Sequence, residues 1–234
     1  SALFILPGFI SSNETGVNTT LGRGGSDYTA AIIAAAIDAK VLEIWTDVSG
    51  MMTADPRVVS NVKIIPQISY QEAMELSHFG AKVIYPPTIQ PVRYKGIPTW
   101  IKNTFAPQDI GTVIQSDTND FENSIRGISS INNVALLSLE GSGMAGVPGF
   151  SKRLFEALAG KKINVILITQ SSSEHSICVG IDLANADIAR KAIDETFAYE
   201  IETKKVDPLV VETDLAVIAV VKKKIKNHTG ISGK

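Results

Sequence analysis

The sequence is poor in cysteine and in long apolar runs. Cys178 is the single cysteine among 234 residues, which excludes a framework of internal disulfides and is typical of a reducing compartment, so we expect a cytoplasmic protein. No apolar run reaches the ~18 residues that a membrane-spanning helix needs. The apolar stretch Leu3–Pro7 has no basic residues before it, which argues against a signal peptide. We therefore expect no membrane partner.

Positive and negative residues are nearly balanced in number. The net charge is -2 and no long basic run occurs, which is not the pattern of a protein whose main partner is nucleic acid. Aromatic residues make up only 6%, but hydrophobic residues make up 44%, enough for a sizeable core in one large or two small domains. The sequence has no initiator methionine, and both ends fall inside apparent elements. We expect it to be a piece of a longer protein.

The most distinctive stretch runs from Asn18 to Thr29 and reads NTTLGRGGSDYT. Its three glycines allow sharp turns and the close approach of a ligand. Ser26 is a good N-cap, and the start of the helix that follows favours an anion. Arg23 suits a carboxylate or phosphate, whereas the Asp27 carboxylate would repel one unless a cation lay between them. The stretch predicts a ligand with an anionic and a cationic group; the alternative is an ordinary glycine-rich turn.

This stretch is not a Walker P-loop, because no Gly-Lys-Ser/Thr ending follows, and not a Rossmann fingerprint, because Asp27 stands where the third glycine would be. The string Thr-Thr-Leu-Gly-Arg-Gly-Gly-Ser-Asp resembles the signature of aspartate kinases, which are members of the amino acid kinase family. The resemblance implies L-aspartate and ATP as substrates, with Mg²⁺ bound to the nucleotide and no other metal. It gives Asp27 the catalytic role, as the partner of the substrate ammonium, of Mg²⁺-bound water or of a catalytic lysine. It implies an aspartate site formed by Phe9, Arg23, Gly24, Gly25 and Ser26.

Three further strings resemble the nucleotide-binding segments of the same kinases. They are Trp-Thr-Asp-Val-x-Gly at 45–50, Thr-x-Asp-Pro-Arg at 53–57 and Phe-Gly-Ala-Lys-Val at 79–83. Composition alone leaves ordinary turn chemistry open for them. The resemblance implies contacts to adenine or ribose and to the phosphates from Thr46, Asp47, Met52, Arg57 and Lys82. Family members often carry an aromatic residue in place of Met52.

The order of patterns predicts an α/β fold with a parallel-rich sheet and flanking helices. With the resemblance, residues 1–115 are expected to be the C-terminal part of an amino acid kinase domain, and 116–132 a linker. A capping box, Ser69 to Glu72, should open a helix. The expected strands are Leu3–Leu6 (buried), Lys40–Trp45 and Thr99–Asn103; the expected helices are Tyr28–Ala39 (buried on most sides), 69–78 and Thr88–Lys95.

Residues 133–213 follow the order βαββαβ, which is that of a ferredoxin-like unit, and they resemble an ACT domain. The expected strands are 134–139, 164–169, 176–181 and 206–211, and the helices are 150–159 and 184–199. Ala135–Ser151 aligns without gaps on Ala216–Ser232, so 214–234 is expected to start a second, truncated ACT unit. Its strand must pair with the first unit's sheet or with a second chain.

The glycine-rich loop 141–149 could hold an effector carboxylate through its backbone N–H groups. Its Gly-x-Gly-Met string and Ile-Thr-Gln-Ser-Ser-Ser-Glu at 168–174 resemble the threonine-sensitive aspartate kinase–homoserine dehydrogenases. Lysine-inhibited relatives tend to carry an acidic residue where Ile166 stands, so threonine is favoured over lysine, and a homo-oligomer through ACT units is expected. The alternative is that Gln170 only ends a strand. The expected effector site comprises Gly143, Met144, Gly146 and Gln170.

The resemblance implies a parent enzyme that forms 4-phospho-L-aspartate, at the first step of lysine, threonine and methionine biosynthesis, under feedback control through ACT domains. The Lys-Phe-Gly-Gly block with which aspartate kinases open is absent, so this chain alone is expected to be inactive. Two alternatives stay open. One is a pure amino-acid-sensing module without chemistry, and the other is an amino acid kinase that acts on glutamate or UMP.

Overall fold

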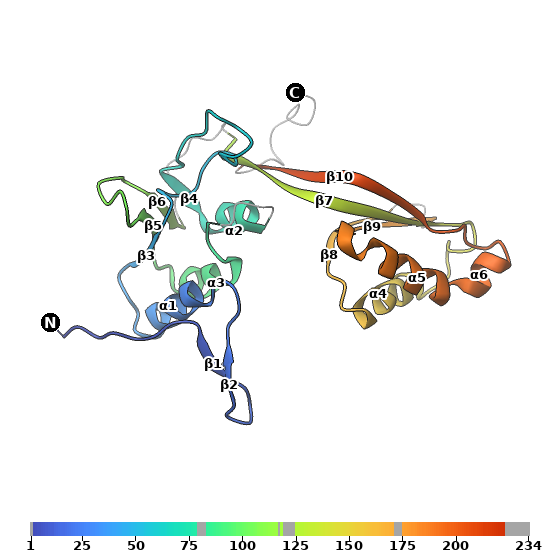
Figure 1. Ribbon diagram of the computed structural model, residues 1–234, viewed down its shortest axis with the longest axis horizontal. Helices are drawn as coiled ribbons and strands as arrows, with labels where there is room; N and C mark the ends of the chain where they lie inside the picture. Colours follow the sequence, from blue (N-terminus) through green and yellow to red (C-terminus); the bar gives the residue numbers. More distant parts are fainter. Residues whose placement is uncertain (1, 79–82, 117, 119–124, 171–174, 223–234) are drawn as a thin grey trace. The chain divides into compact units, whose positions relative to one another are not determined.

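The computed structural model describes residues 2–78, 83–116, 118, 125–170 and 175–222. The chain forms two compact units, Ser1–Ser130 with Ile218–Lys234, and Ile131–Val217 (Figure 1). In this described part, no helix combines the length and the apolar character needed to cross a bilayer. Lys82 and the segments 171–174 and 223–234, to which the sequence gives functional or repeat assignments, lie outside the described residues.

The first unit is built on a four-stranded sheet in the order β3-β5-β6-β4. β3 runs parallel to β5 and β4 parallel to β6, whereas β5 and β6 are antiparallel. A small hairpin, β1 with β2, precedes the sheet. The elements are β1 Ile10–Ser12, β2 Asn18–Thr20, α1 Gly25–Ala36, β3 Leu42–Thr46, β4 Gln67–Ser69, α2 Tyr70–His78, α3 Pro86–Lys95, β5 Thr99–Asn103 and β6 Thr112–Gln115.

Helices and strands of the first unit share one apolar core. α1 and α3 pack side by side (Figure 1), and Ala31 and Ala34 of α1 meet Ile89 and Val92 of α3 among its fully or nearly fully buried side chains. Small alanines on α1 let the two helices approach closely. The predicted parallel-rich α/β architecture is confirmed.

Two expectations for the start of the chain are wrong. Residues 3–6 form no strand, and their side chains are 62–88% exposed, because no neighbouring strand is present among the described residues to accept this apolar run. Helix α1 is not buried on most sides, since Ile32 and Ile37 are 43% and 70% exposed. Its N-cap is Gly24 rather than Ser26, and no side chain bonds to that end.

Four strands of this unit, β1, β2, β4 and β6, were not predicted from the sequence. Thr99–Asn103 is a strand as expected, but it is not the last one of this unit, because the chain returns through Gly111 into β6. Gly111 has φ +81°, and a Cβ there would stand 2.3 Å from the carbonyl oxygen of Ile101. A glycine at this point lets β6 fold back tightly against β5.

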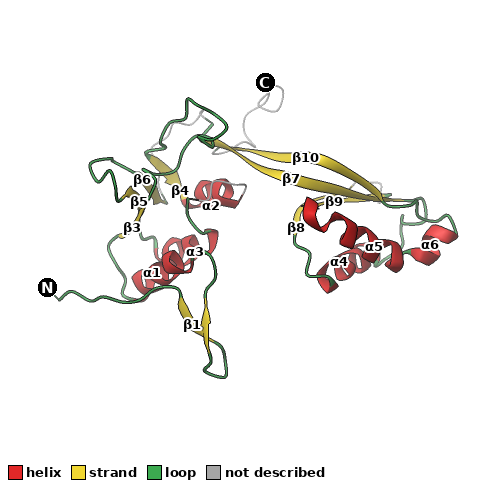
Figure 2. Cartoon of the chain, viewed as in Figure 1, coloured by secondary structure: helices red, strands yellow, loops and turns green. Residues whose placement is uncertain are grey.

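The second unit has the ferredoxin-like order predicted for it. Its sheet runs β10-β7-β9-β8, with β9 antiparallel to both β7 and β8. Helices α4 and α5 lie together on one side of these strands (Figure 2). The elements are β7 Gly127–Glu140, α4 Phe150–Gly160, β8 Val165–Gln170, β9 Ser176–Asp182, the 3-10 helix η1 Leu183–Asn185, α5 Ala186–Thr196, α6 Ala198–Glu202 and β10 Val210–Val221.

Two long strands differ from the expected boundaries. β7 begins at Gly127, inside the stretch 116–132 that was expected to be a linker. β10 runs without a break through residue 214, where a second ACT unit was expected to begin. β10 pairs with β7 at the edge of the same sheet, which is the first of the two pairings that the sequence allowed. The backbone contacts Arg126 N–Val221 O and Asp207 N–Glu140 O show that the two strands are antiparallel.

A buried carboxylate lies where α2 meets the start of β7. One oxygen of Glu72 accepts hydrogen bonds from the backbone N–H and the hydroxyl of Ser69, at 2.9 and 2.6 Å, as the capping box predicted. Its other oxygen accepts from Arg126 Nε at 3.3 Å. The side chains of Glu72 and Arg126 are only 5% and 7% exposed. An ion pair this deeply buried requires both partners, because either charge alone would be costly.

We predict that Arg126→Met destabilises the first unit by about 3–5 kcal/mol, because it leaves the Glu72 carboxylate buried without its cation. The double variant Glu72→Gln/Arg126→Met should recover much of that loss, since no buried charge remains. Urea denaturation of the chain measures both.

The matched control is Lys95→Met, which breaks an ion pair with Asp38 at a shorter 2.6 Å, but one whose side chains are 39% and 74% exposed. Screening by water limits its expected loss to about 0–1 kcal/mol. Equal losses from Arg126→Met and Lys95→Met would contradict the role given to the buried pair.

Candidate functional site

The glycine-rich turn leads from the β1–β2 hairpin into α1. Gly24 has φ +75°, a conformation that other residues adopt only under strain. A Cβ on Gly24 would stand 2.4 Å from Cβ of Tyr85, the residue that precedes α3. Gly25 is buried, and a Cβ there would stand 2.7 Å from Cβ of Leu21. The turn therefore needs glycine at both positions, for its backbone conformation and for its packing.

Arg23, Gly24 and Asp27 line one pocket of about 250 Å³. The opposite side of the pocket comes from the end of α2 and from the segment that enters α3, with Ser77 and Tyr85. The aromatic rings of Tyr28 and Tyr85 pack edge to face, with centroids 6.3 Å apart. The full described lining is Arg23, Gly24, Asp27, Ser77, Val83, Ile84, Tyr85 and Pro86. A cationic and an anionic side chain thus share one small cavity, as the mixed-ligand hypothesis requires.

Partial burial destabilises the charged form of the Asp27 carboxylate. Partial burial raises its pKa above the ordinary value of 3.8, and a hydrogen bond with the Ser26 side chain offsets only part of that rise. Asp27 lies in the first turn of α1, where the helix dipole favours an anion. A cationic group bound in the pocket would remove the remaining penalty.

Three predicted aspartate-site residues do not line the pocket. Phe9 has φ +73°, unusual for a residue with a side chain, and its backbone N–H donates to Thr29 Oγ1 at 3.2 Å. Its ring lies near Gly25, at 3.1 Å from the Cβ position there. Ser26 is exposed on the first turn of α1. Phe9, Gly25 and Ser26 are thus next to Arg23 and Asp27 in the fold, but the pocket lining does not include them.

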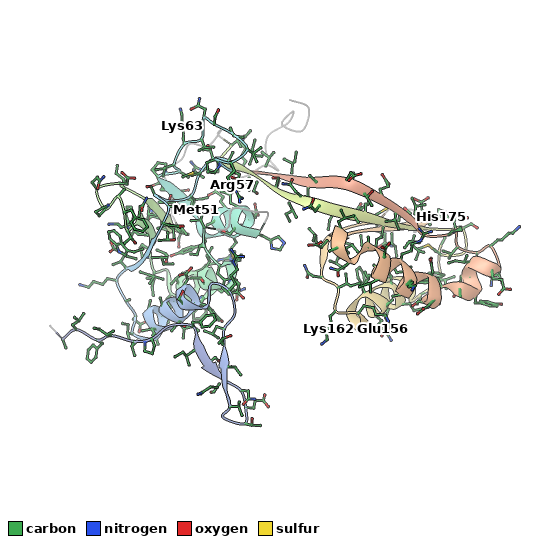
Figure 3. The ribbon with its side chains drawn as sticks, in the orientation of Figure 1. Met51, Arg57, Lys63, Glu156, Lys162 and His175 are labelled. Carbon is green, nitrogen blue, oxygen red and sulfur yellow. The ribbon has the colours of Figure 1, made fainter. Side chains whose placement is uncertain are left out.

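The predicted nucleotide residues follow β3. Thr46 ends the strand, and its hydroxyl bonds to the Asp47 carboxylate at 3.1 Å. The ends of such strands are where α/β sheets bind ligands. Met52 forms an isolated bridge with Ile64. In Figure 3, Arg57 lies on the same loop as Met51 and Lys63, between β3 and β4. Lys82, the fifth predicted residue, lies outside the described residues.

Arg57 is held by Asp55 two residues earlier. Its guanidinium donates to both carboxylate oxygens, with the shortest contact at 2.6 Å. Hydrogen bonding to Arg57 lowers the pKa of Asp55 to about 2, so the pair is charged throughout the neutral range. The Arg57 side chain is 81% exposed. Its charge therefore remains within reach of an anionic ligand that approaches from solvent.

The second unit has a pocket of about 370 Å³ between the glycine-rich loop, the start of α4 and the end of β8. Met144, Gly146 and Gln170, three of the predicted effector residues, line it together with Phe150 and Ile177. Gly143 lies instead on a neighbouring pocket of about 150 Å³ with Arg153 and Lys205. The predicted effector residues thus line two adjacent cavities instead of one.

The backbone donors of this loop are partly in use. The N–H of Gly143 donates to Lys205 O at 2.9 Å, and that of Met144 donates to Gly141 O at 3.2 Å. Neither is directed to a ligand, as a glycine-rich nest would require. The start of α4 offers other donors, because its N-cap Gly149 (φ +103°) has no side chain to satisfy them.

Sequence reasoning missed Ser77 and Tyr85, which complete the pocket around Arg23 and Asp27. Ser77 stands on the buried stripe of α2, seven residues after Tyr70 and four after Ala73, both of them core residues. A hydroxyl on an otherwise apolar stripe is the signal that was available. The approach of Tyr85 to Gly24 is a tertiary contact across some sixty residues, and no local pattern indicates it.

The comparisons with known proteins agree for both units. Residues 1–103 match the amino acid kinase family, and residues 137–197 match the ACT domain. The bifunctional aspartokinase/homoserine dehydrogenase of Haemophilus influenzae is 43% identical over 230 residues, which are 98% of this chain and 28% of that protein. The chain thus spans little more than a quarter of this relative.

Solved structures show the same fold. Aspartokinase III of Escherichia coli in complex with aspartate and ADP (R-state) is 36% identical, with a TM-score of 0.78 over 96% of this chain and 49% of that one. The same enzyme in complex with lysine and aspartate (T-state) is 38% identical, with a TM-score of 0.72 over 91% of this chain and 46% of that one.

We predict that Asp27→Asn raises the melting temperature of the chain near pH 7. A carboxyl whose pKa is raised in the folded state loses stability as pH rises from its unfolded value through its folded value, so the ionised side chain is a penalty at neutral pH. The advantage of the variant should vanish below about pH 3.8, where both states are protonated. Thermal unfolding at several pH values measures it.

The control is Asp187→Asn, because Asp187 also stands in the first turn of a helix, α5, but is exposed. That variant loses a favourable dipole interaction and should be neutral or slightly less stable. A fall in melting temperature for Asp27→Asn at neutral pH would show that burial does not penalise this carboxylate.

Proposed function

This chain joins part of an amino acid kinase domain to an ACT domain, as aspartokinases do, and on that premise we propose that it belongs to an ATP-dependent L-aspartate kinase that forms 4-phospho-L-aspartate. The observation that carries the proposal is the pocket shared by Arg23, Gly24 and Asp27. Aspartate has two carboxylates and one ammonium group, which suit a guanidinium and a carboxylate that face the same cavity.

In this proposal Arg23 binds a substrate carboxylate through its forked N–H donors. Asp27 faces the ammonium group, which offsets the burial of its own charge. The left-handed turn at Gly24 fixes both residues relative to each other, and phosphoryl transfer depends mainly on such positioning and on charge neutralisation. Glutamate or UMP kinase activity is the alternative within the family; the similarity to aspartokinases over nearly all of this chain favours aspartate.

ATP is the proposed phosphoryl donor and would supply the transferred group, with Mg²⁺ bound to its phosphates. Thr46 ends β3 and Asp47 follows it, at the sheet edge suited to a nucleotide, and Arg57 presents an exposed guanidinium. Because the chain spans about half or less of its relatives, we propose that the rest of the longer protein completes the site. The isolated chain should then bind ligands without turnover.

We further propose that the pocket of the second unit binds threonine as an effector. The N–H groups at the start of α4, to which Gly149 offers no side-chain cap, suit its carboxylate. The Gln170 amide can both donate to and accept from its hydroxyl. Lysine is named as the ligand of an E. coli neighbour, but none of the described lining residues is acidic, and an ammonium group enclosed without an acidic partner is costly.

We also propose that the protein forms a homo-oligomer through its ACT region. β8 is an edge strand, and its Leu167 and Ile168 are 39% and 58% exposed. Apolar edge strands favour pairing with another strand. Gln170 ends this strand, so a second copy paired along β8 would also lie against the effector pocket.

The test of the proposed reaction is Arg23→Ala in the complete protein that contains this chain. Loss of a charge-assisted contact costs about 1.5–3 kcal/mol, so KM for aspartate should rise roughly ten- to a hundred-fold. KM for ATP should change little. Arg93→Ala, at an exposed arginine of α3 away from the pocket, should leave both values unchanged. Equal rises in both KM values would refute the assignment of Arg23 to aspartate.

The test of the effector uses calorimetry of the complete protein with threonine, valine and lysine. Valine has the shape of threonine without the hydroxyl, so the wild type should bind threonine more tightly. Gln170→Ala should abolish that preference, whereas Thr169→Ala, on the other face of β8, should keep it. Tighter binding of lysine than of threonine, or a preference that survives Gln170→Ala, would remove threonine as the effector.

A further inference from the structure

Ser77 carries a buried hydroxyl that has no hydrogen-bond partner among the residues that the structure describes. It lies near the end of α2, one residue before His78, and only 7% of its surface is exposed. Its Oγ is shielded from solvent and unpartnered. Such a group has lost its bonds to water without replacing them, which is unfavourable by about 1–3 kcal/mol. A buried polar atom left in this state calls for an explanation.

A local partner was available to Ser77 in principle. Hydroxyl groups within helices commonly bond back to the carbonyl four residues earlier. Among the described residues, Thr29 and Thr196 within helices and Thr203 at the C-cap of α6 do so, to Gly25 O at 2.8 Å, Ala192 O at 2.7 Å and Tyr199 O at 2.8 Å. Ser77 does not. Because its hydroxyl holds no bond, a turn about its Cα–Cβ bond toward a ligand would break none.

Ser77 lines the same pocket as Arg23 and Asp27. The cavity of about 250 Å³ has room for roughly eight water-sized groups, at ~30 Å³ each, which suits a small amino acid. Arg23 is the one cationic side chain among the described lining residues, and it can fully satisfy one carboxylate. A ligand with two carboxylates needs a second donor, and the unpartnered hydroxyl of Ser77 can become that donor by turning about its Cα–Cβ bond into the pocket.

We propose that Ser77 is a substrate-binding residue whose hydroxyl donates a hydrogen bond to a carboxylate of the amino acid held between Arg23 and Asp27. This inference rests on the proposed aspartate kinase function and adds to it a contact from α2. The ligand would then be contacted from two elements, the glycine-rich turn and the end of α2. Recognition of a dicarboxylic amino acid, rather than one with a single carboxylate, would depend on both.

The experiment compares Ser77→Ala and Ser77→Cys with Thr88→Val in the complete protein. Thr88 in α3 is a matched control, because its Oγ1 is also buried and unpartnered but does not line the pocket. Removal of either orphan hydroxyl should not lower the melting temperature. Both Ser77 variants should raise KM for aspartate roughly tenfold or more, the loss typical of a hydrogen bond to a charged group, and leave KM for ATP unchanged. Thr88→Val should leave both within twofold.

Arg23→Ala separates failure of this inference from failure of the function on which it rests. If Arg23→Ala raises KM for aspartate and the Ser77 variants do not, the role of Ser77 is overturned and the proposed function stands. If Arg23→Ala has no effect either, the pocket is not the aspartate site. An equal rise in KM for Thr88→Val and Ser77→Ala would show a packing effect and would also overturn the assignment.

Discussion

The first unit depends on the buried carboxylate of Glu72. Its two oxygens are used by two different parts of the chain, one by Ser69 at the start of α2 and the other by Arg126 just before β7. Because neither charge can be buried alone, the end of β4, the start of α2 and the entry to β7 must meet at this point. One ion pair thus joins three separate segments of the first unit.

Helix α2 connects this constraint to the candidate site. Glu72 lies in its first turn and Ser77 in its last, with the core residues Ala73 and Leu76 between them. A short helix anchored at one end by an ion pair and along one side by the core has little freedom to shift. The pocket face at its far end is therefore held at a defined place relative to the glycine-rich turn, which is a condition for selective binding of a small ligand.

The helix ends and the strand that were predicted correctly are those that interactions between residues near in sequence determine. The capping box of Ser69 and Glu72 and the left-handed glycine after α3, Gly96, set the helix ends where the pattern placed them. The strand Thr99–Asn103 was also predicted to the residue. The Arg23–Asp27 motif predicted two charged side chains that the structure brings into one pocket.

The elements and contacts that were predicted wrongly, or not at all, depend on residues that are distant in the sequence. Residues 3–6 have the apolar pattern of a strand, but a strand also needs a neighbour, and none of the described strands pairs with them. β6 was missed because its return against β5 depends on the close approach of Gly111 to Ile101. Tyr85 reaches the glycine-rich turn only through the packing of α3 on α1. None of these contacts can be predicted from the pattern of a short stretch of sequence.

Two unfavourable groups of the first unit lie in the same small cavity. Asp27 is an anion whose pKa is raised by partial burial, and Ser77 is a hydroxyl without a partner. Folding alone gives no reason for either, because an asparagine and an alanine would fit the same backbone with less penalty. A ligand that brings an ammonium group to Asp27 and a carboxylate oxygen to Ser77 would satisfy both at once. Groups that are poorly solvated in the free protein are already desolvated when the ligand arrives, so binding need not remove their water. The local instability of this pocket is therefore itself a physical argument that it is a site for a charged amino acid.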